Sequence, residues 1–314
     1  MLGFLIRRLG ISIVLIVCVA TLVFSLMHMM PGDPVLLILG SNPNQEAIDA
    51  FRKALGLNRP LLEQYSEWMR GLLTFDLGNS LRNRESVGRL VTDRLPRTFE
   101  LIAFAFVLAA LIGMPLGIHA ATRAGTIADT TTTIAGVLGM SIPNFVVGIV
   151  LIVLFAITWR VLPSGGYSLV SRGLADHLKR LLLPGVTLSI PLAAVTMRMT
   201  RSSMLETMEK EFVRTARSKG LREQRVLVKH VLRLAMIPVS SLLGAEIAAL
   251  FGGTVIVEQI FFWPGLSTLL VTAAHSRDYP VVQGAIVTIA MLLVTLNLVV
   301  DIGISMLDPR IRLD

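Results

Sequence analysis

The chain has 314 residues, of which 54% are hydrophobic and only 16% are charged, and its mean hydropathy is +0.72. This is more apolar surface than the core of a soluble domain can bury, so the composition excludes an ordinary soluble protein and predicts one that uses a lipid bilayer as solvent. The net charge of +8 does not call for nucleic acid, because the position of the basic residues relative to membrane spans accounts for it.

Apolar runs without charge recur along the chain, and a helix needs roughly 20 such residues to cross a hydrocarbon core of ~30 Å. We therefore expect an all-α, polytopic membrane protein with about six transmembrane helices. The third run contains Pro143. The fourth is short and contains Pro184 and Pro191, so we expect a kinked helix that extends into its polar flanks. The six runs lie between Arg8 and Asp33, Glu100 and Arg123, Asp129 and Arg160, Arg180 and Arg198, Arg233 and Glu258, and Asp278 and Asp301.

The runs divide the chain into three parts. The first run is longer than the apolar core of a secretory signal and is not followed by a small-residue cleavage site, so we expect residues 1–30 to remain as the N-terminal end and first span. Residues 31–98 form a small helical insertion outside the membrane, in which 44–57 and 61–73 each favour a short helix. Residues 99–314 form the transmembrane core.

The orientation in the membrane follows from the distribution of basic residues. The segment from Arg198 to Arg233 holds ten Lys and Arg residues against four Glu, and the positive-inside rule places such a segment in the cytoplasm. Six crossings then place both termini in the cytoplasm and the insertion 31–98 outside. Long loops translocate regardless of their own charge, so the basic residues of the insertion are no objection.

The sequence carries no constellation typical of an enzyme or of a self-sufficient pump. It has no Gly-Lys dipeptide, which excludes the phosphate-binding loop of an ATPase, and we expect no catalytic residue in this chain. Its histidines lack the spacing of metal ligands, so no metal site is expected. Any ATP must be hydrolysed by another chain. The five histidines are His28, His119, His177, His230 and His275.

The basic segment from Arg198 to Arg233 contains the sequence pattern that points to a function. Less polar residues recur at helical spacing between Leu205 and Lys219, which predicts one amphipathic helix. Gly220 supplies a C-terminal stop, and a second helix opens at Leu221. The pattern leaves two interpretations open: a basic helix pair that lies on anionic lipid, or a compact knob that docks into the groove of a partner protein. The apolar stripe consists of Leu205, Met208, Phe212, Thr215 and Ala216.

Two acidic residues mark the fifth apolar run. An intramembrane carboxylate such as Glu246 costs roughly 2.5 to 3.5 kcal/mol on insertion scales, so it usually faces a water-filled pathway or a partner. A protonated or hydrogen-bonded acid at a helix interface is the structural alternative. Glu258 ends the run and is expected to be an interfacial or gate residue. A proton-coupled secondary transporter that uses Glu246 as its carrier is the alternative function, and a non-transporting scaffold leaves this acid without a role.

The segment 214–221, Arg-Thr-Ala-Arg-Ser-Lys-Gly-Leu, is followed by His230 and by the pair Ile237-Pro238. It resembles the cytoplasmic coupling loop of binding-protein-dependent ABC importer permeases, and within them the dipeptide and oligopeptide family. The resemblance continues in order along essentially the whole chain. The further motifs are Met30-Pro31-Gly32-Asp33-Pro34, Leu55-Gly56-Leu57 with Arg59-Pro60, Asp76-Leu77-Gly78 with Ser80, Ser141-Ile142-Pro143, Trp263-Pro264-Gly265, Arg277-Asp278-Tyr279-Pro280-Val281-Val282-Gln283 and Asp308-Pro309-Arg310-Ile311-Arg312.

The resemblance implies a multi-pass protein of the bacterial cytoplasmic membrane that pairs with a second homologous permease. It also implies two cytoplasmic ATPase subunits, which bind ATP and Mg, and an extracytoplasmic solute-binding protein. Relatives carry peptides, glutathione and nickel complexes.

The resemblance assigns coupling to the loop 201–232. The general coupling motif places Glu-Ala-Ala ahead of Gly, whereas Arg214 and Thr215 stand where Glu and the first Ala would be, a departure common in the peptide branch. The residues expected to couple to the ATPases are Glu211, Phe212, Arg214, Thr215, Ala216, Lys219, Gly220, Leu221 and Glu223.

Overall fold

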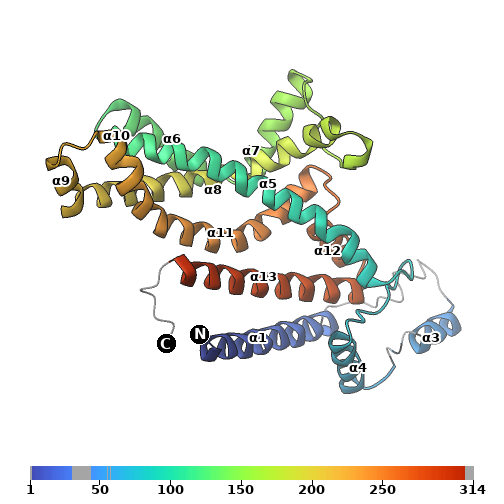
Figure 1. The fold of residues 1–314 in the computed structure, drawn as a ribbon. Helices are drawn as coiled ribbons and strands as arrows, with labels where there is room; N and C mark the ends of the chain where they lie inside the picture. The colour runs from blue at the N-terminus through green and yellow to red at the C-terminus, as the bar shows by residue number, and fades with distance from the viewer. Residues whose placement is uncertain (1, 30–43, 55, 57, 308–314) are drawn as a thin grey trace. The chain divides into compact units, whose positions relative to one another are not determined.

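A computed structural model describes residues 2–29, 44–54, 56 and 58–307. This part of the chain is helical, with one isolated antiparallel bridge between Asn79 and Ser86. The expected motifs at 30–34 and 308–312, and Leu55 and Leu57, lie outside the described residues. In chain order (Figure 1) the elements are α1 (Leu2–Met29), α3 (Gln45–Ala54), α4 (Leu61–Leu73), α5 (Val87–Thr122), α6 (Ile127–Ser141), α7 (Asn144–Leu151), a π-helical segment (Ile152–Thr158), a 3-10 turn (Val170–Arg172), α8 (Leu174–Met208), α9 (Glu211–Ser218), α10 (Glu223–Val226), a second π-helical segment (Leu227–Leu232), α11 (Arg233–Ile260), α12 (Leu266–His275) and α13 (Tyr279–Leu307).

The membrane-spanning helices agree with the expected number. Among the described residues five helices are long and apolar enough to cross a membrane, and the count becomes six if the bent pair α6 and α7 is one span. The two arms of this pair meet at 102°, at the break that holds Ile142 and Pro143. A proline lacks the N–H that would continue the helix and disfavours helical geometry in the residue before it.

The structure gives more exact limits for α8 and α5 than the sequence did, and it adds a helix between the last two spans. Helix α8 extends beyond both charged ends of the fourth apolar run and contains Pro184 and Pro191, which confirms the expected extension into the flanks. Helix α5 begins at Val87, ahead of the limit expected at residue 98. The segment between the fifth and sixth spans contains a further helix, α12, in which Leu266 and Leu269 are buried.

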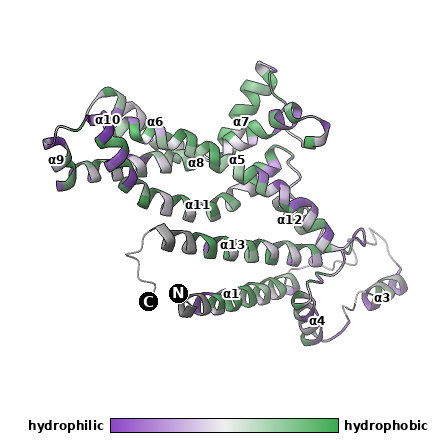
Figure 2. Ribbon diagram, viewed as in Figure 1, coloured by the Kyte–Doolittle hydropathy of each residue, from purple (hydrophilic) through white to green (hydrophobic). Residues whose placement is uncertain are grey.

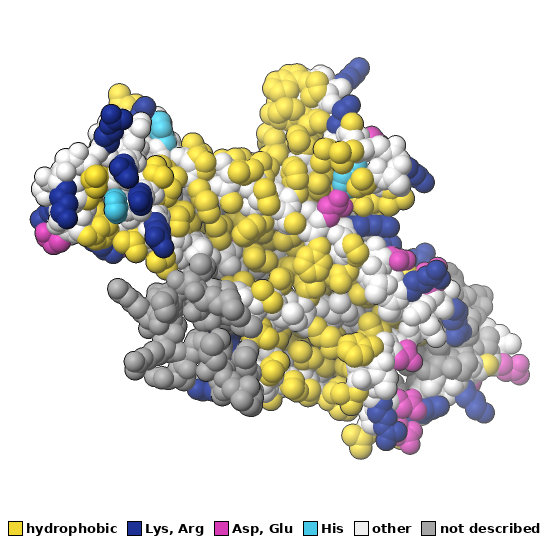
Figure 3. All heavy atoms as spheres, in the orientation of Figure 1, with side chains coloured by type: hydrophobic (Ala, Val, Ile, Leu, Met, Phe, Trp, Pro, Cys, Tyr) yellow, Lys and Arg dark blue, Asp and Glu magenta, His cyan; other side chains and the backbone are white. Residues whose placement is uncertain are grey.

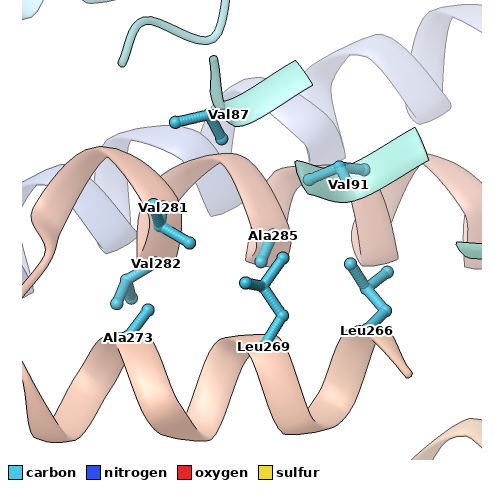
Figure 4. Packing of buried hydrophobic residues seen from close by; sticks show 8 residues of the cluster. All are labelled: Val87, Val91, Leu266, Leu269, Ala273, Val281, Val282 and Ala285. Carbon is cyan, nitrogen blue, oxygen red and sulfur yellow. The ribbon is translucent and has the colours of Figure 1, made fainter. Parts of the chain in front are cut away.

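The chain forms two compact units. Unit 1 comprises residues 1–98 and 264–295, and unit 2 comprises 99–263 and 296–314, so α5 and α13 contribute residues to both. In unit 1, α12, the start of α13 and the start of α5 share an apolar core (Figure 4). Gly284 of α13 permits this packing, because a Cβ there would lie 2.6 Å from Val87 Cγ1. Asp278, just before α13, accepts hydrogen bonds from Ser80 Oγ and from the Leu81 N–H.

Unit 2 is built around α8, which packs against α6, α7 and α11. Small residues bring α5 close to it: a Cβ at Gly113 would lie 2.5 Å from the Ala193 carbonyl oxygen, and one at Gly117 would lie 2.6 Å from that of Met197. This spacing of small residues is typical of packed membrane helices. Large apolar side chains remain exposed on the outside of unit 2, as a lipid-facing surface requires. They include Leu111, Val137 and Ile149.

Candidate functional site

The candidate site is the loop between α8 and α11. The single helix expected from Leu205 to Lys219 is wrong, because α8 ends at Met208 and α9 starts at Glu211. Lys210, at the break, has extended backbone angles of φ −69° and ψ 145°. The loop therefore consists of a turn, α9, a second turn and α10, which continues through the π-helical segment into α11. Figure 2 shows hydrophilic colouring on parts of α9 and α10, whereas α7 is largely hydrophobic.

The inner face of α9 is apolar. Val213 is fully buried and Ala216 is nearly so, and both pack in a cluster with residues from α8 and from the helices that follow α9. Restarting the helix at Glu211 changes which side chains share a face. Phe212, expected on the same stripe as Ala216, is 37% exposed instead. The other buried members of the cluster are Ala121, Met204, Val226, Val231 and Ala235.

The turn after α9 has the geometry expected at Gly220. This glycine has φ +73°, its N–H donates to the Arg217 carbonyl at 2.9 Å, and the Leu221 N–H donates to the Ala216 carbonyl at 3.4 Å. These two bonds form the Schellman arrangement that ends many helices. Leu221 packs against the same apolar cluster as Val213. The expected glycine stop is thus confirmed, and the turn is anchored to the core of unit 2.

A bidentate ion pair spans this turn. Arg217 Nε lies 3.1 Å from Glu223 Oε2, and Arg217 Nη2 lies 2.7 Å from Glu223 Oε1. The hydrogen bonds that Arg217 donates to the Glu223 carboxylate are the main cause that raises the pKa of Arg217. Both side chains are largely exposed, so the pair contributes more to the angle between α9 and α10 than to stability. Sequence reasoning selected Glu223 but missed Arg217.

The outer face of the loop carries most of the sequence-predicted coupling residues. Figure 3 shows Lys and Arg side chains gathered at the end of unit 2 that holds α9 and α10. Ala216 differs from the rest of the predicted set, because it is buried and supports α9 from inside, and Leu221 is half-buried. The exposed members are Glu211, Phe212, Arg214, Thr215, Lys219, Gly220 and Glu223.

Beside this loop lies an ion pair that the sequence did not reveal. Asp129, in the first turn of α6, accepts from Arg201 Nε at 2.6 Å and from Arg201 Nη2 at 2.8 Å. Its carboxylate also accepts from the Gly125 N–H at 3.0 Å. On the same part of α8, Ser203 Oγ donates to the Ala235 carbonyl of α11 at 2.8 Å. These bonds join α6, α8 and α11 at the base on which α9 packs.

The two acids of the fifth run do not lie together. Glu246 is half-buried in the middle of α11, whereas Glu258 is fully buried near its end. Twelve residues of helix separate them by roughly 18 Å along the axis. Glu258 was expected to be an interfacial or gate residue, and its side chain lies in the interior of unit 2. The backbone carbonyl of Glu258 accepts a hydrogen bond from the Trp263 backbone N–H.

Comparison with known proteins places the chain in a family. The family described as binding-protein-dependent transport system inner membrane component matches residues 113–313, and the N-terminal model of the same description matches residues 1–102. The chain therefore belongs to the binding-protein-dependent transport system inner membrane components. It is a multi-pass inner membrane protein and the non-catalytic permease subunit of an ABC importer, in which ATP is bound by partner ATPases.

Relatives resemble the chain over its full length. The dipeptide transport system permease protein DppB of Escherichia coli K12 is 37% identical, with 99% of each chain covered. A Brucella ovis protein named as a peptide permease is 39% identical over the same shares. A chain of the MetNI methionine ABC transporter has a TM-score of 0.54 at 16% identity, and the match covers 70% of this chain and 96% of that one. The last similarity concerns the fold alone.

Proposed function

We propose that this permease moves dipeptides or oligopeptides into the cytoplasm by alternating access. The names of the full-length relatives support peptides as the solute class. Glutathione and nickel complexes are the other solutes that the sequence resemblance implies, and they form the competing outcomes of a transport test. The comparisons lend no support to proton-coupled secondary transport with Glu246 as carrier.

The proposed assembly contains a second homologous permease, two ATPase subunits and an extracytoplasmic binding protein. In this arrangement both termini and the loop 201–232 are cytoplasmic, and residues 31–98 lie outside. The basic surface of α9 and α10 supports the orientation, because positively charged loops are retained in the cytoplasm. A half-buried Glu246 is compatible with a side chain that reaches the pathway. The full burial of Glu258 favours a role at a closed gate rather than contact with solute.

The docking of the ATPase subunits is assigned to the outer face of α9 and the Gly220 turn. The observation that carries this assignment is the exposure of Phe212 among charged neighbours on a helix whose other face is fixed by Val213 and Ala216. A helix laid into a groove is held by such an apolar anchor, while the surrounding charges set orientation. A helix that lies only on lipid would direct its apolar residues towards the membrane.

Phe212→Asp tests this assignment, with Phe75→Asp as a matched control. Phe75 is 83% exposed and belongs to unit 1, whereas α9 belongs to unit 2, so the control makes the same chemical change outside α9. We expect Phe212→Asp to reduce co-purification of the ATPase subunits and solute-stimulated hydrolysis in reconstituted vesicles, and Phe75→Asp to retain both. Equal retention by the two variants would remove α9 from the docking surface and leave it as a membrane-surface helix.

The solute class needs a separate measurement. We expect the binding protein encoded with this permease to bind dipeptides or oligopeptides, and unlabelled peptides to compete for uptake into vesicles that contain the full complex. Competition by glutathione or by a nickel complex, without competition by peptides, would contradict the peptide assignment while leaving the permease function intact.

A further inference from the structure

A line of basic residues leaves the loop 201–232 and runs into the start of α11. Arg225 of α10, Lys229 of the second π-helical segment and Arg233, the first residue of α11, are all exposed. They stand four residues apart, so they share one side of the continuous helix. The π-helical bonds run from residue i to i+5, and such a turn holds more than the roughly 3.6 residues of an α-helical turn. This brings residues at a spacing of four closer to a straight line.

The opposite side of the same helix is fixed in the core of unit 2. Val226, Val231 and Ala235 are fully buried, in the cluster that also holds Val213 of α9. Packing therefore determines which side of the helix faces outward. A second line, apolar and at least partly exposed, flanks the basic one. It consists of Val228, Leu232 and Met236.

The described part of the chain supplies no anion for the basic line. Between Glu223 and Glu246 the sequence contains no Asp or Glu. Both carboxylate oxygens of Glu223 are engaged with Arg217. Among the described residues, none of the three cations of the line takes part in a salt bridge or a side-chain hydrogen bond. An anion that neutralises them must come from elsewhere.

The position of the line along the helix matches the level of lipid headgroups. The charge-free run of α11 begins directly after Arg233, so the hydrocarbon layer begins near this residue. The headgroup layer adds roughly 5 to 8 Å on each side, and four residues of helix rise about 6 Å. Arg233 and Lys229 therefore lie within the headgroup layer. Arg225 lies about 12 Å from Arg233, beyond the layer but within a Debye length of ~8 Å of it.

We propose that the line of Arg225, Lys229 and Arg233 binds the phosphate of an anionic phospholipid. Lipid phosphates stand at this level of the bilayer, and basic clusters directly beside a span attract them. The exposed Val228 also fits a lipid surface better than it fits water. The two interpretations of the loop are thus divided between two surfaces, the outer face of α9 for the ATPase and the basic line for lipid. This site goes beyond the proposed function, and of the features discussed above it requires only that α11 spans the membrane.

The reporter is Val228→Cys in a Cys18→Ser background, labelled with bimane. Val228 is 66% exposed beside the line, and Cys18 is an exposed thiol that would otherwise be labelled. The full-length permease is placed in nanodiscs of phosphatidylcholine. A small fraction of the lipid is phosphatidylglycerol or phosphatidylcholine with a nitroxide near the ester end of one acyl chain. The ratio of quenching by the two labelled lipids measures the enrichment of the anionic lipid next to the line.

We expect a several-fold enrichment of phosphatidylglycerol in the reporter protein. Lys229→Gln and Arg233→Gln should each lower it by up to about fivefold, the contribution of one basic residue at a membrane surface. Arg225→Gln should lower it less, because that residue lies beyond the headgroup layer. Arg222→Gln is the matched control, since Arg222 is exposed and lies further still from α11, and it should leave the enrichment unchanged. Arg233→Lys should retain it.

Four results would overturn the lipid site. Equal quenching by both lipids would leave the cations with no role beyond membrane orientation. Enrichment that survives the double change Lys229→Gln and Arg233→Gln would place the anionic lipid elsewhere. Displacement by inorganic phosphate, compared with chloride at equal ionic strength, would indicate a site for free anions. Loss of enrichment when the ATPase subunits are added would show that the basic line faces the ATPase.

Thermal unfolding of each variant checks that it is folded, and if the double variant is not, the two single variants decide the question. The double variant keeps eight of the ten Lys and Arg residues between 198 and 233. A nanodisc exposes both faces of the bilayer, so the result does not depend on the orientation of the chain in the cell. It does not depend on peptide transport either, so failure of the proposed function would be detected separately.

Discussion

Replacement of Gly220 by valine isolates the contribution of the turn between α9 and α10. The backbone at Gly220 has φ +73°, and a Cβ placed there would meet no atom within 4 Å. A clash of the added Cβ within the described part of this chain is therefore excluded as a cause, and backbone strain remains. The left-handed conformation costs an L-residue roughly 1 to 2 kcal/mol, and a β-branched side chain stands at the upper end of that range or above it.

Strain of this size acts on a small part of the molecule. Each 1.4 kcal/mol is about a tenfold change in an equilibrium constant. The substitution should therefore lower the ratio of aligned to misaligned turn by a factor of roughly 5 to 30. The spans do not depend on this turn. We therefore expect Gly220→Val to insert into the membrane and to pair with its partner permease, but to bind ATPase subunits more weakly or to hydrolyse ATP without transport.

The assay measures co-purification of ATPase subunits and solute-stimulated hydrolysis in reconstituted vesicles. Gly220→Asn should retain ATPase co-purification and stimulated hydrolysis close to those of the unchanged protein, because Asn tolerates the left-handed region better than most residues other than glycine. Gly78→Val is the matched control, since Gly78 has φ +76° and equally open space but belongs to unit 1. The reasoning fails if Gly220→Val keeps full docking and stimulation, or if Gly78→Val causes the same loss of docking.

Three further outcomes follow from the described contacts. A cysteine at Ser66 should react only from outside the cell and one at Ser218 only from the cytoplasm, measured with an impermeant thiol reagent; reversed labelling would refute the topology. Glu246→Gln should assemble normally and alter transport, whereas failed assembly with full transport in the remaining fraction would make Glu246 structural. Asp129→Ala and Arg201→Ala should each lower the melting temperature and the double variant should lower it by less than the sum; additive losses would contradict a direct pair.

Much of the fold follows from local sequence, because a span is specified by the length of its own apolar run. The helix expected at 61–73 has the bounds of α4, and Gly220 marked the end of α9 through its backbone freedom alone. The break between α8 and α9 was not predictable in this way. Glu209 and Lys210 favour helix by propensity, and packing of Val213 and Ala216 into the core outweighs that weak preference.

The missed parts of the candidate site are long-range pairs. Asp129 marked only the start of a span, and Arg201 was one basic residue among ten in its segment. Their bidentate contact depends on α6 and α8 packing together, a relation that no local spacing encodes. The pair between Glu100 of α5 and His177 of α8 was missed for the same reason. Metal-binding histidines can be found in a sequence by their short spacing, whereas a buried histidine paired with a carboxylate on another helix leaves no short-range pattern.

The length of α8 connects the two ends of unit 2. Its 35 residues span roughly 50 Å at 1.5 Å per residue, which exceeds a hydrocarbon core of ~30 Å. The polar ends can therefore lie outside the apolar layer, with His177 at one and Arg201 at the other. Between them, Gly113 and Gly117 hold α5 so close to α8 that the pair cannot slide without a clash. We therefore expect a displacement imposed at α9 to move α5 and α8 together, and with them the loop that contacts His177.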